Sequence, residues 1–250
     1  MTSMRLALIG DPVEHSRSPE LQREFLRRAE IEGTYEAIRV ESGAAARAID
    51  ELRTAGYSGI NVTTPLKEEA FARAEWRDAT ALASGSVNTL VLGERVEGYN
   101  TDGIGALGAL GDAGLSELAG SRVLVLGAGP TARAAVAALS AADAAVFVWN
   151  RTPERAAAIV AELGVLAFEP GVRFDAVFAA LPPGATLADP LLVSVVLDAP
   201  LFVDANYGER ATLAAALGRR SAADGFTMLQ HSARASFELW HNAFRHHRAG

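Results

Sequence analysis

Residues 123–132 read Val-Leu-Val-Leu-Gly-Ala-Gly-Pro-Thr-Ala, and this stretch decides the fold class of the chain. A short apolar run ends in a G-x-G-x-x-A turn, and helical spacing begins at Pro130. In such a turn the first glycine permits the bend, the second lets the backbone approach a pyrophosphate, and the small third residue packs helix on strand. Backbone N–H groups at the helix start then face phosphates. The pattern predicts a dinucleotide-binding unit; a tight turn without a ligand is the alternative.

The end of the next predicted strand indicates which dinucleotide the unit would hold. An NAD site places an acid there, ~20 residues on, to hold the ribose 2′-hydroxyl. This chain instead has Asn-Arg-Thr-Pro-Glu-Arg at 150–155. Two guanidinium groups and a hydroxyl suit a 2′-phosphate, because arginine offers a planar fork of donors. We therefore expect NADP, with Thr152 also serving as a helix N-cap before Pro153. A methyltransferase is disfavoured, because it usually needs an acid at this strand end.

Short β-branched runs alternate with stretches of helical spacing along the chain, which is typical of α/β folds with a parallel sheet. The second half carries predicted strands at 123–126, 146–149, 176–180 and 201–204. The first part carries predicted strands at 6–9, 35–40 and 59–62, and an antiparallel hairpin of 87–92 and 96–99 at the sheet edge. The last helical pattern, 227–247, has no strand after it, so we expect it to return to the first domain. The predicted domains are 1–102 with 224–250, and 103–223.

Composition excludes several classes of function. Lys and Arg total 23 against 30 Asp and Glu, and a net charge of −7 gives no basic excess for nucleic acid. The chain has no cysteine, which excludes disulfides, Cys-ligated zinc and thiol catalysis. None of the five histidines has a partner at ligand spacing, so no metal is expected. No run approaches the ~20 apolar residues that span a bilayer, and a cytoplasmic protein fits.

Polar groups also gather at predicted strand ends in the first part. Ser18 before Pro19 is a sufficient N-cap, which leaves Ser16 free to help hold a carboxylate at the positive helix end. Lys67 follows the strand at 59–62, and Asp102, a plausible N-cap, follows the hairpin. Each of these residues, taken alone, is explained equally well by a purely structural role as a solvated or helix-capping side chain. Together they place an ammonium and a carboxylate at strand ends, where α/β sites are built.

Six motifs occur in one order along the chain. They are Ser-x-Ser-Pro at 16–19, Asn-Val-Thr-x-Pro-x-Lys at 61–67, Val-Asn-Thr at 87–89, Asn-Thr-Asp-Gly at 100–103, the glycine turn at 127–132, and Asn-Arg-Thr-x-x-Arg at 150–155. In this order and spacing the chain resembles the shikimate dehydrogenase family over nearly its whole length. The resemblance implies NADPH-dependent reduction of 3-dehydroshikimate to shikimate, on the route to aromatic amino acids. It also implies an N-terminal substrate domain, an NADP-binding Rossmann domain and a cleft between them, with a homodimer left open.

The resemblance assigns roles to individual residues. Ser16 and Ser18 would hold the substrate carboxylate. Thr63, Asn88 and Asp102 would hold its hydroxyls, and Tyr207 would lie near it. Lys67 would be the catalytic acid/base, with Asp102 as its catalytic partner. The residues expected to line the cofactor are Gly127, Ala128, Gly129, Pro130, Thr131, Asn150, Arg151, Thr152, Arg155, Ala205 and Gly225.

Three departures from the family pattern bear on function. Pro130 replaces a second glycine and removes an N–H that would face the pyrophosphate. Ala-Ala-Leu-Pro-Pro-Gly at 179–184 replaces the family's Asn-Ala-Thr-Ser-x-Gly, and Ser232 replaces a glutamine on the last helix. Two other functions therefore stay open. One is a paralogue acting on quinate or another cyclic hydroxy acid, and the other is a non-catalytic NADP-binding regulator, which the retention of Lys67 and Asp102 disfavours.

Overall fold

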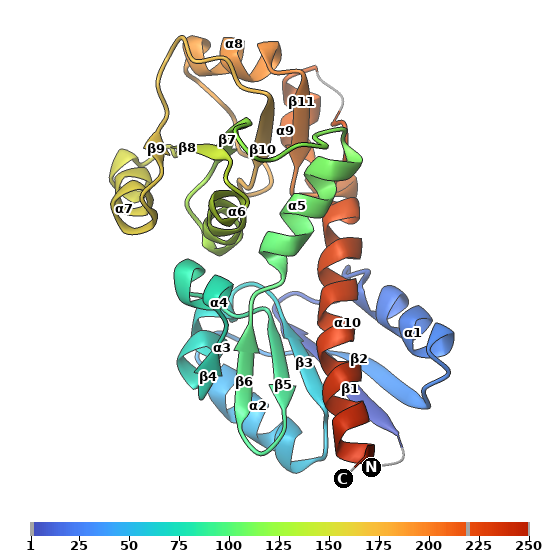
Figure 1. The fold of residues 1–250 in the computed structure, drawn as a ribbon. Coiled ribbons are helices and arrows are strands. Elements are labelled where there is room, and N and C mark those ends of the chain that lie inside the picture. The colour runs from blue at the N-terminus through green and yellow to red at the C-terminus, as the bar shows by residue number, and fades with distance from the viewer. Residues whose placement is uncertain (1–2, 219–220, 250) are drawn as a thin grey trace. The chain divides into compact units, whose positions relative to one another are not determined.

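The computed structural model describes residues 3–218 and 221–249, and the chain divides into two compact units (Figure 1). The first unit runs to Thr101 and resumes at Ser232, and the second is Asp102–His231. The divisions therefore follow residues 101 and 231, whereas the sequence suggested divisions after 102 and 223. The second division falls inside a single long helix, α10 (Gly225–Ala249). Because the helix continues across this division, the hydrophobic spacing of the sequence is not interrupted there. The sequence therefore gives no signal for the boundary.

The first unit is built on a six-stranded mixed sheet in the order β2-β1-β3-β5-β6-β4. Strands β2, β1 and β3 are parallel, and β5 is antiparallel to both β3 and β6. The expected hairpin is therefore present, but it is not the edge of the sheet, because β4 pairs with β6. A two-residue strand carries no periodic signal. The strands are β1 (Met4–Gly10), β2 (Gly33–Arg39), β3 (Gly59–Val62), β4 (Trp76–Arg77), β5 (Thr89–Leu92) and β6 (Val96–Tyr99).

Helices cover both faces of this sheet, which explains why its central strands read as unbroken apolar runs. The side chains of β1 alternate: Ala7 and Ile9 join a core with one set of helices, whereas Leu6 and Leu8 join a core with α10. Trp240 of α10 donates its indole N–H to the Leu90 carbonyl at 2.8 Å. The remaining helices of this unit are α1 (Ser18–Arg28), α2 (Ala45–Thr54), α3 (Lys67–Arg73) and α4 (Ala79–Ser84).

The second unit is built on a five-stranded, fully parallel sheet in the order β11-β10-β7-β8-β9. Val123 and Val125 of β7 point into one core and Leu124 and Leu126 into another, so helices cover both faces here as well. The strands are β7 (Arg122–Leu126), β8 (Ala145–Trp149), β9 (Leu166–Ala167), β10 (Ala176–Ala179) and β11 (Leu201–Asp204). The helices are α5 (Asp102–Asp112), α6 (Pro130–Ala141), α7 (Pro153–Leu163), α8 (Pro190–Asp198), α9 (Thr212–Ala216) and a short 3-10 turn, Gly208–Arg210.

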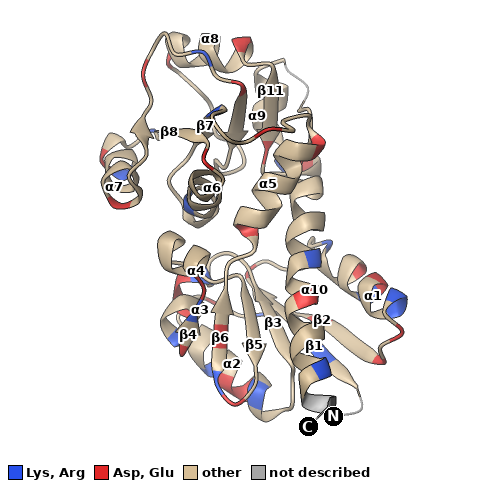
Figure 2. Cartoon of the chain, viewed as in Figure 1, with Lys and Arg blue, Asp and Glu red and all other residues tan. Residues whose placement is uncertain are grey.

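The expected α/β class, with one mixed sheet and one parallel Rossmann-like sheet, is confirmed. Charged residues of both signs are interspersed on the outer helices α1, α2 and α7 (Figure 2). Across residues 3–218 and 221–249, every helix is too short or too polar to traverse a lipid bilayer.

Candidate active site

The glycine turn after β7 has the geometry that a phosphate-binding turn needs. Gly127 has φ +123°, and a Cβ there would lie 2.6 Å from the Ala180 carbonyl oxygen, so only glycine fits. Gly129 is the N-cap of α6 and Pro130 is its first residue, as expected. A Cβ on Gly129 would meet no atom within 4 Å. Packing within the chain therefore does not require this second glycine, and its open surface fits the approach of a dinucleotide pyrophosphate.

The end of β8 presents the two arginines expected beside an adenosine phosphate. Arg151 and Arg155 are exposed, and within the described part of the chain neither guanidinium has a hydrogen-bond or ion-pair partner. Thr152 occupies the N-cap position of α7, but its hydroxyl caps nothing; its carbonyl accepts from the Arg155 N–H at 3.1 Å. The expected N-cap position of Thr152, directly before Pro153, is therefore confirmed, although the Thr152 side chain makes no capping hydrogen bond. Asn150 instead braces this turn by donating from Nδ2 to the Thr152 carbonyl at 3.0 Å.

The end of β11 contacts the start of α10 closely. A Cβ on Gly225 would lie 2.1 Å from the Ala205 carbonyl oxygen, so glycine is required at this contact. The ring of Tyr207 packs edge-on against Phe226, with 6.1 Å between centroids. Asn206, which the sequence did not single out, donates from Nδ2 to the Leu181 carbonyl at 2.9 Å. It thereby joins the loop after β11 to the loop after β10, where the chain departs from its family pattern.

Asp102 belongs to the second unit and contacts the glycine-turn helix. It is the first residue of α5 rather than a residue preceding the helix, and its side chain is buried. Its Oδ2 accepts a hydrogen bond from the Thr131 hydroxyl at 3.1 Å. A residue expected to touch substrate and one expected to touch cofactor are thus directly bonded.

The loop between β1 and α1 places two serine hydroxyls together. Helix α1 begins at Ser18 itself, so the prediction of Ser18 as N-cap is wrong. Ser16 Oγ instead accepts from the Ser18 N–H at 3.2 Å, which is a capping contact, and it donates to Ser18 Oγ at the same distance. Nearby, burial of the Tyr35 phenol raises the pKa of Tyr35. Tyr35 in turn donates to Asn61 Oδ1 at 2.8 Å.

Thr63 and Lys67 follow the carboxyl end of β3, next to the end of β1. A Cβ on Gly10 would lie 2.3 Å from Thr63 Cγ2, so the two strand ends approach as closely as glycine allows. Lys67 is the first residue of α3 and is half-buried. Its carbonyl accepts from the Val87 N–H at 2.9 Å, which fixes the start of α3 against the segment that carries Asn88.

Asn88 lies in a buried polar network that the sequence identified only in part. Its Nδ2 lies 3.5 Å from Ser232 Oγ on α10, and its Oδ1 accepts from the backbone N–H of Thr101 at 2.9 Å. Thr101 Oγ1 and Ser232 Oγ lie 2.8 Å apart. The members that sequence analysis missed are Asn61, Thr89, Thr101 and Ser236. The first three stand inside the quoted motifs, whereas Ser236 is marked only by its spacing of four residues from Ser232.

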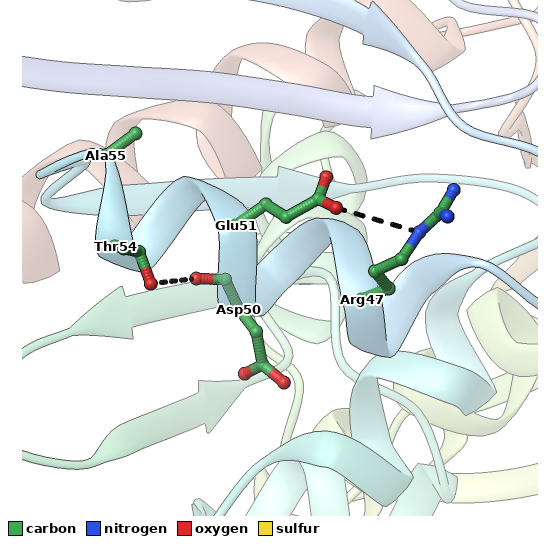
Figure 3. Close-up of a pocket in the computed structure, with 5 residues that line it drawn as sticks. All are labelled: Arg47, Asp50, Glu51, Thr54 and Ala55. Atoms are coloured by element: carbon green, nitrogen blue, oxygen red, sulfur yellow. Dashed lines mark hydrogen bonds and ion pairs between the residues drawn. The ribbon is translucent and has the colours of Figure 1, made fainter.

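The structure also contains a surface hollow on α2, which is unrelated to these residues. It is lined by Arg47, Asp50, Glu51, Thr54 and Ala55, all from one helix and its end (Figure 3). Arg47 pairs with Glu51 at 3.8 Å, and the Thr54 hydroxyl donates to the Asp50 carbonyl at 2.8 Å. The Asp50 carboxylate pairs with Arg73 of α3, and no predicted site residue lines this hollow.

Two models of known protein families match this chain. Residues 8–90 match the family model described as the shikimate dehydrogenase substrate binding domain, and residues 109–176 match that of shikimate / quinate 5-dehydrogenase. The chain belongs to the shikimate dehydrogenase family. The two matched segments fall in the first and second units, respectively.

Individual relatives in the shikimate dehydrogenase family agree with this assignment. Shikimate dehydrogenase (NADP(+)) of Methanothrix thermoacetophila is 36% identical over 245 residues, covering 94% of this chain and 90% of the relative. The enzyme of the same name from Methanococcoides burtonii is 41% identical over 160 residues, which are 63% of this chain and 58% of that relative. Shikimate 5-dehydrogenase from Thermus thermophilus, solved in complex with NADP(H) and shikimate, superposes with a TM-score of 0.81. It is 35% identical, over 95% of this chain and 93% of its own.

Proposed function

We propose that this protein is the enzyme that reduces 3-dehydroshikimate to shikimate with NADPH. The observation that carries the proposal is the carboxyl edge of the first unit's sheet, where Ser16, Thr63, Lys67 and Asn88 follow or precede neighbouring strands. Relatives named shikimate dehydrogenase (NADP(+)) align over almost the whole chain and support the assignment.

The second unit is the proposed NADP-binding domain. NADPH supplies the hydride when it is bound. The turn from Gly127 to Thr131 would hold the pyrophosphate at the start of α6, and Asn150, Thr152, Ala205 and Gly225 would line the rest of the site. Arg151 and Arg155 would hold the 2′-phosphate, because exposed guanidinium groups pair well with phosphate oxygens.

The first unit is the proposed substrate domain. Ser16 and Ser18 would hold the substrate carboxylate, since their hydroxyls lie together at the first turn of α1. Thr63 and Asn88, with Asp102 from the second unit, would hold the ring hydroxyls. Tyr207 would lie near the substrate.

Lys67 would supply the proton that completes the reaction. When hydride reaches the carbonyl carbon, the Lys67 ammonium would protonate the carbonyl oxygen, which yields the hydroxyl of the product. Asp102 would position the ammonium and a substrate hydroxyl. In the reverse direction the neutral Lys67 amine would take this proton.

A second candidate substrate is quinate or another cyclic hydroxy acid. The observation that favours it is Ser232, which stands where the family has a glutamine and bonds Thr101 beside Asn88. A site remodelled at this position would accept different ring substituents. A regulator that binds NADP without turnover is the other alternative.

One experiment separates these functions. Purified protein is incubated with NADP⁺ and either shikimate or quinate, and formation of NADPH is followed by absorbance. The proposal expects a kcat/KM for shikimate well above that for quinate. Faster oxidation of quinate would favour the paralogue, and no oxidation of either would favour the regulator.

We also propose a cytoplasmic location, where reductive biosynthesis draws on NADPH. Light scattering would test whether the protein forms a homodimer.

A further inference from the structure

The loop that follows β10 lies next to the glycine turn of the second unit. In the strand order β11-β10-β7-β8-β9, the chain runs from β7 to β8 and β9 on one side and continues with β10 and β11 on the other. Open α/β sheets bind ligands at the carboxyl ends of the strands at such a switch point. The Ala180 carbonyl oxygen would lie 2.6 Å from a Cβ on Gly127. Residues 180–184 therefore border the proposed cofactor site on the side of β10.

This loop has few polar groups with which to hold its own position. Residues 181–184 read Leu-Pro-Pro-Gly, and none of these side chains can form a hydrogen bond. The two prolines also lack a backbone N–H. The Ala185 N–H donates to the Pro182 carbonyl at 3.1 Å, which closes the turn on itself. The position of this turn relative to the sheet must be fixed by other segments.

Asn206, in the loop after β11, supplies one of the bonds that fix the turn. Its Nδ2 donates to the Leu181 carbonyl at 2.9 Å and to Asp204 Oδ1 at 3.0 Å. An amide nitrogen carries two protons, so each of these bonds has a proton of its own. A backbone carbonyl can only accept, so the atom of Asn206 that faces Leu181 must be the nitrogen. These two bonds hold the Asn206 amide in one orientation.

Asp204 and Thr212 complete the support of the turn. Asp204 is buried at the end of β11, and its Oδ1 also accepts from the backbone N–H of Asn206 at 2.9 Å. This contact is an Asx turn, which fixes the chain directly after the strand. Thr212, the first residue of α9, accepts at Oγ1 from the Gly184 N–H at 2.8 Å. The turn is thus tied at both of its ends to the segment that follows β11, and all these residues belong to the second unit.

We propose that Asn206 and Thr212 are positioning residues for the nicotinamide half of NADP. Arg151 and Arg155, after β8, are the proposed partners of the adenosine 2′-phosphate. A dinucleotide bound across the switch point then places its nicotinamide half on the other side of the glycine turn, toward β10. By bonding Leu181 and Gly184, Asn206 and Thr212 fix the loop that borders this half. The proposal rests on the proposed function, since it takes NADP as the ligand.

A comparison of two ligands tests this positioning role. Asn206→Leu keeps about the same side-chain size and removes the N–H donors. Calorimetry measures Kd for NADP⁺ and for adenosine 2′,5′-bisphosphate, which is the adenosine half of the cofactor without the nicotinamide. The variant is expected to raise Kd for NADP⁺ about tenfold, which equals about 1.4 kcal/mol. Its Kd for the adenosine fragment is expected to stay within about twofold, less than 1.4 kcal/mol, because this fragment does not extend to the loop after β10.

The matched control is Ser121→Ala. The Ser121 side chain is buried directly before β7, and its hydroxyl donates to the Leu118 carbonyl at 2.7 Å. Its removal costs a bond from a side chain to a backbone carbonyl in the same unit, at the amino end of the strand that the glycine turn follows. Both Kd values are expected to equal those of the wild type. Thr212→Val keeps the β-branched shape and removes the acceptor for Gly184, so it tests the proposal if Asn206→Leu does not fold.

Two results would overturn the inference. One is an equal rise of Kd for both ligands, which would make these residues general supports of the domain. The other is an unchanged Kd for NADP⁺ in folded variants. If the wild type binds neither ligand, the proposed function fails and the inference fails with it. Binding of both ligands by the wild type, without a selective loss of NADP⁺ affinity in the variants, rejects the inference alone.

Discussion

The Thr131 hydroxyl donates a hydrogen bond of 3.1 Å to Oδ2 of Asp102 and so joins the first turn of α6 to the first residue of α5. Thr131 belongs to the proposed cofactor turn, and Asp102 is the proposed partner of Lys67. The carboxylate is therefore oriented by the same turn that would hold the pyrophosphate. Under the proposed function, substrate and cofactor recognition would share this contact.

Thr131→Val keeps the shape of the side chain and removes the donor. A hydrogen bond to a charged group is worth about 1.5–3 kcal/mol, so kcat/KM for shikimate is expected to fall at least roughly tenfold. Steady-state kinetics with NADP⁺ measure this. The matched control is Thr54→Val, which removes an exposed helix hydroxyl on α2. Equal losses in both variants, or no loss in Thr131→Val, would show that this bond does not orient Asp102.

Cofactor preference follows from the exposed guanidinium groups of Arg151 and Arg155. A charge-assisted contact with the 2′-phosphate contributes about 1.5–3 kcal/mol, so NADP is expected to exceed NAD by more than roughly tenfold in kcat/KM. Replacing both arginines by alanine should raise KM for NADP and leave KM for NAD nearly unchanged. The ratio of the two kcat/KM values is the measurement. Equal values for the two cofactors in the wild type would reject the role of the arginines.

Ser232→Gln tests the departure from the family pattern on α10. Ser232 bonds Thr101 and lies beside Asn88, so a glutamine here carries an amide toward the proposed substrate hydroxyls. We expect the wild type to have a higher KM for shikimate than family members that carry the glutamine. The variant should recover part of the affinity for shikimate, with a kcat similar to that of the wild type. The contrary outcome is a variant with the same shikimate KM as the wild type, together with a wild type that already prefers quinate. The position has then been remodelled for another substrate.

Glu69 of α3 contributes to stability by capping α2 from a distance. Its carboxylate accepts from the Gly43 N–H at 2.8 Å, the Ala45 N–H at 3.1 Å and the Ser42 hydroxyl at 3.1 Å. These donors, led by the Gly43 N–H, lower the pKa of Glu69. Because the folded pKa is depressed, this stability is present above the unfolded pKa and is lost as pH falls through the folded value.

Glu69→Gln is therefore expected to lower the free energy of unfolding by ~1 kcal/mol near neutral pH, the usual worth of a helix cap. The difference from the wild type should shrink as the pH falls to around 3, where carboxylates protonate. Urea unfolding at several pH values measures it, with the exposed neighbour Glu68→Gln as control. A difference that stays constant with pH would contradict this assignment.

The sequence predicted those elements whose ends carry chemical signals. Strand β3 has the predicted bounds, Gly59–Val62, because a glycine begins the strand and two threonines and a proline follow it. The turn at Gly127 was found because its bend and its packing both require small residues. Helix α8 was missed because it is apolar almost all round and gives no period, and the two-residue strands β4 and β9 were missed because they are too short.

The candidate site was predicted where it lies in local motifs and missed where distant segments meet. Ser16, rather than Ser18, accepts the capping N–H, since the helix begins one residue earlier than expected. Ser236 reads as an ordinary helix residue until α10 is placed against β5, 147 residues away in sequence. Glu69 caps a helix from 24 residues away in sequence, so no local capping motif reveals it.

Lys67→Ala provides the most direct test of the proposed chemistry. NADPH formation from shikimate and NADP⁺ is measured for the wild type and the variant, and shikimate Kd is measured for both. The account predicts an active wild type and a variant whose kcat is lower by about 10²–10⁴-fold, the usual contribution of general acid–base catalysis, with Kd changed only a few-fold. An inactive wild type, or a variant that keeps near-wild-type kcat, would contradict it.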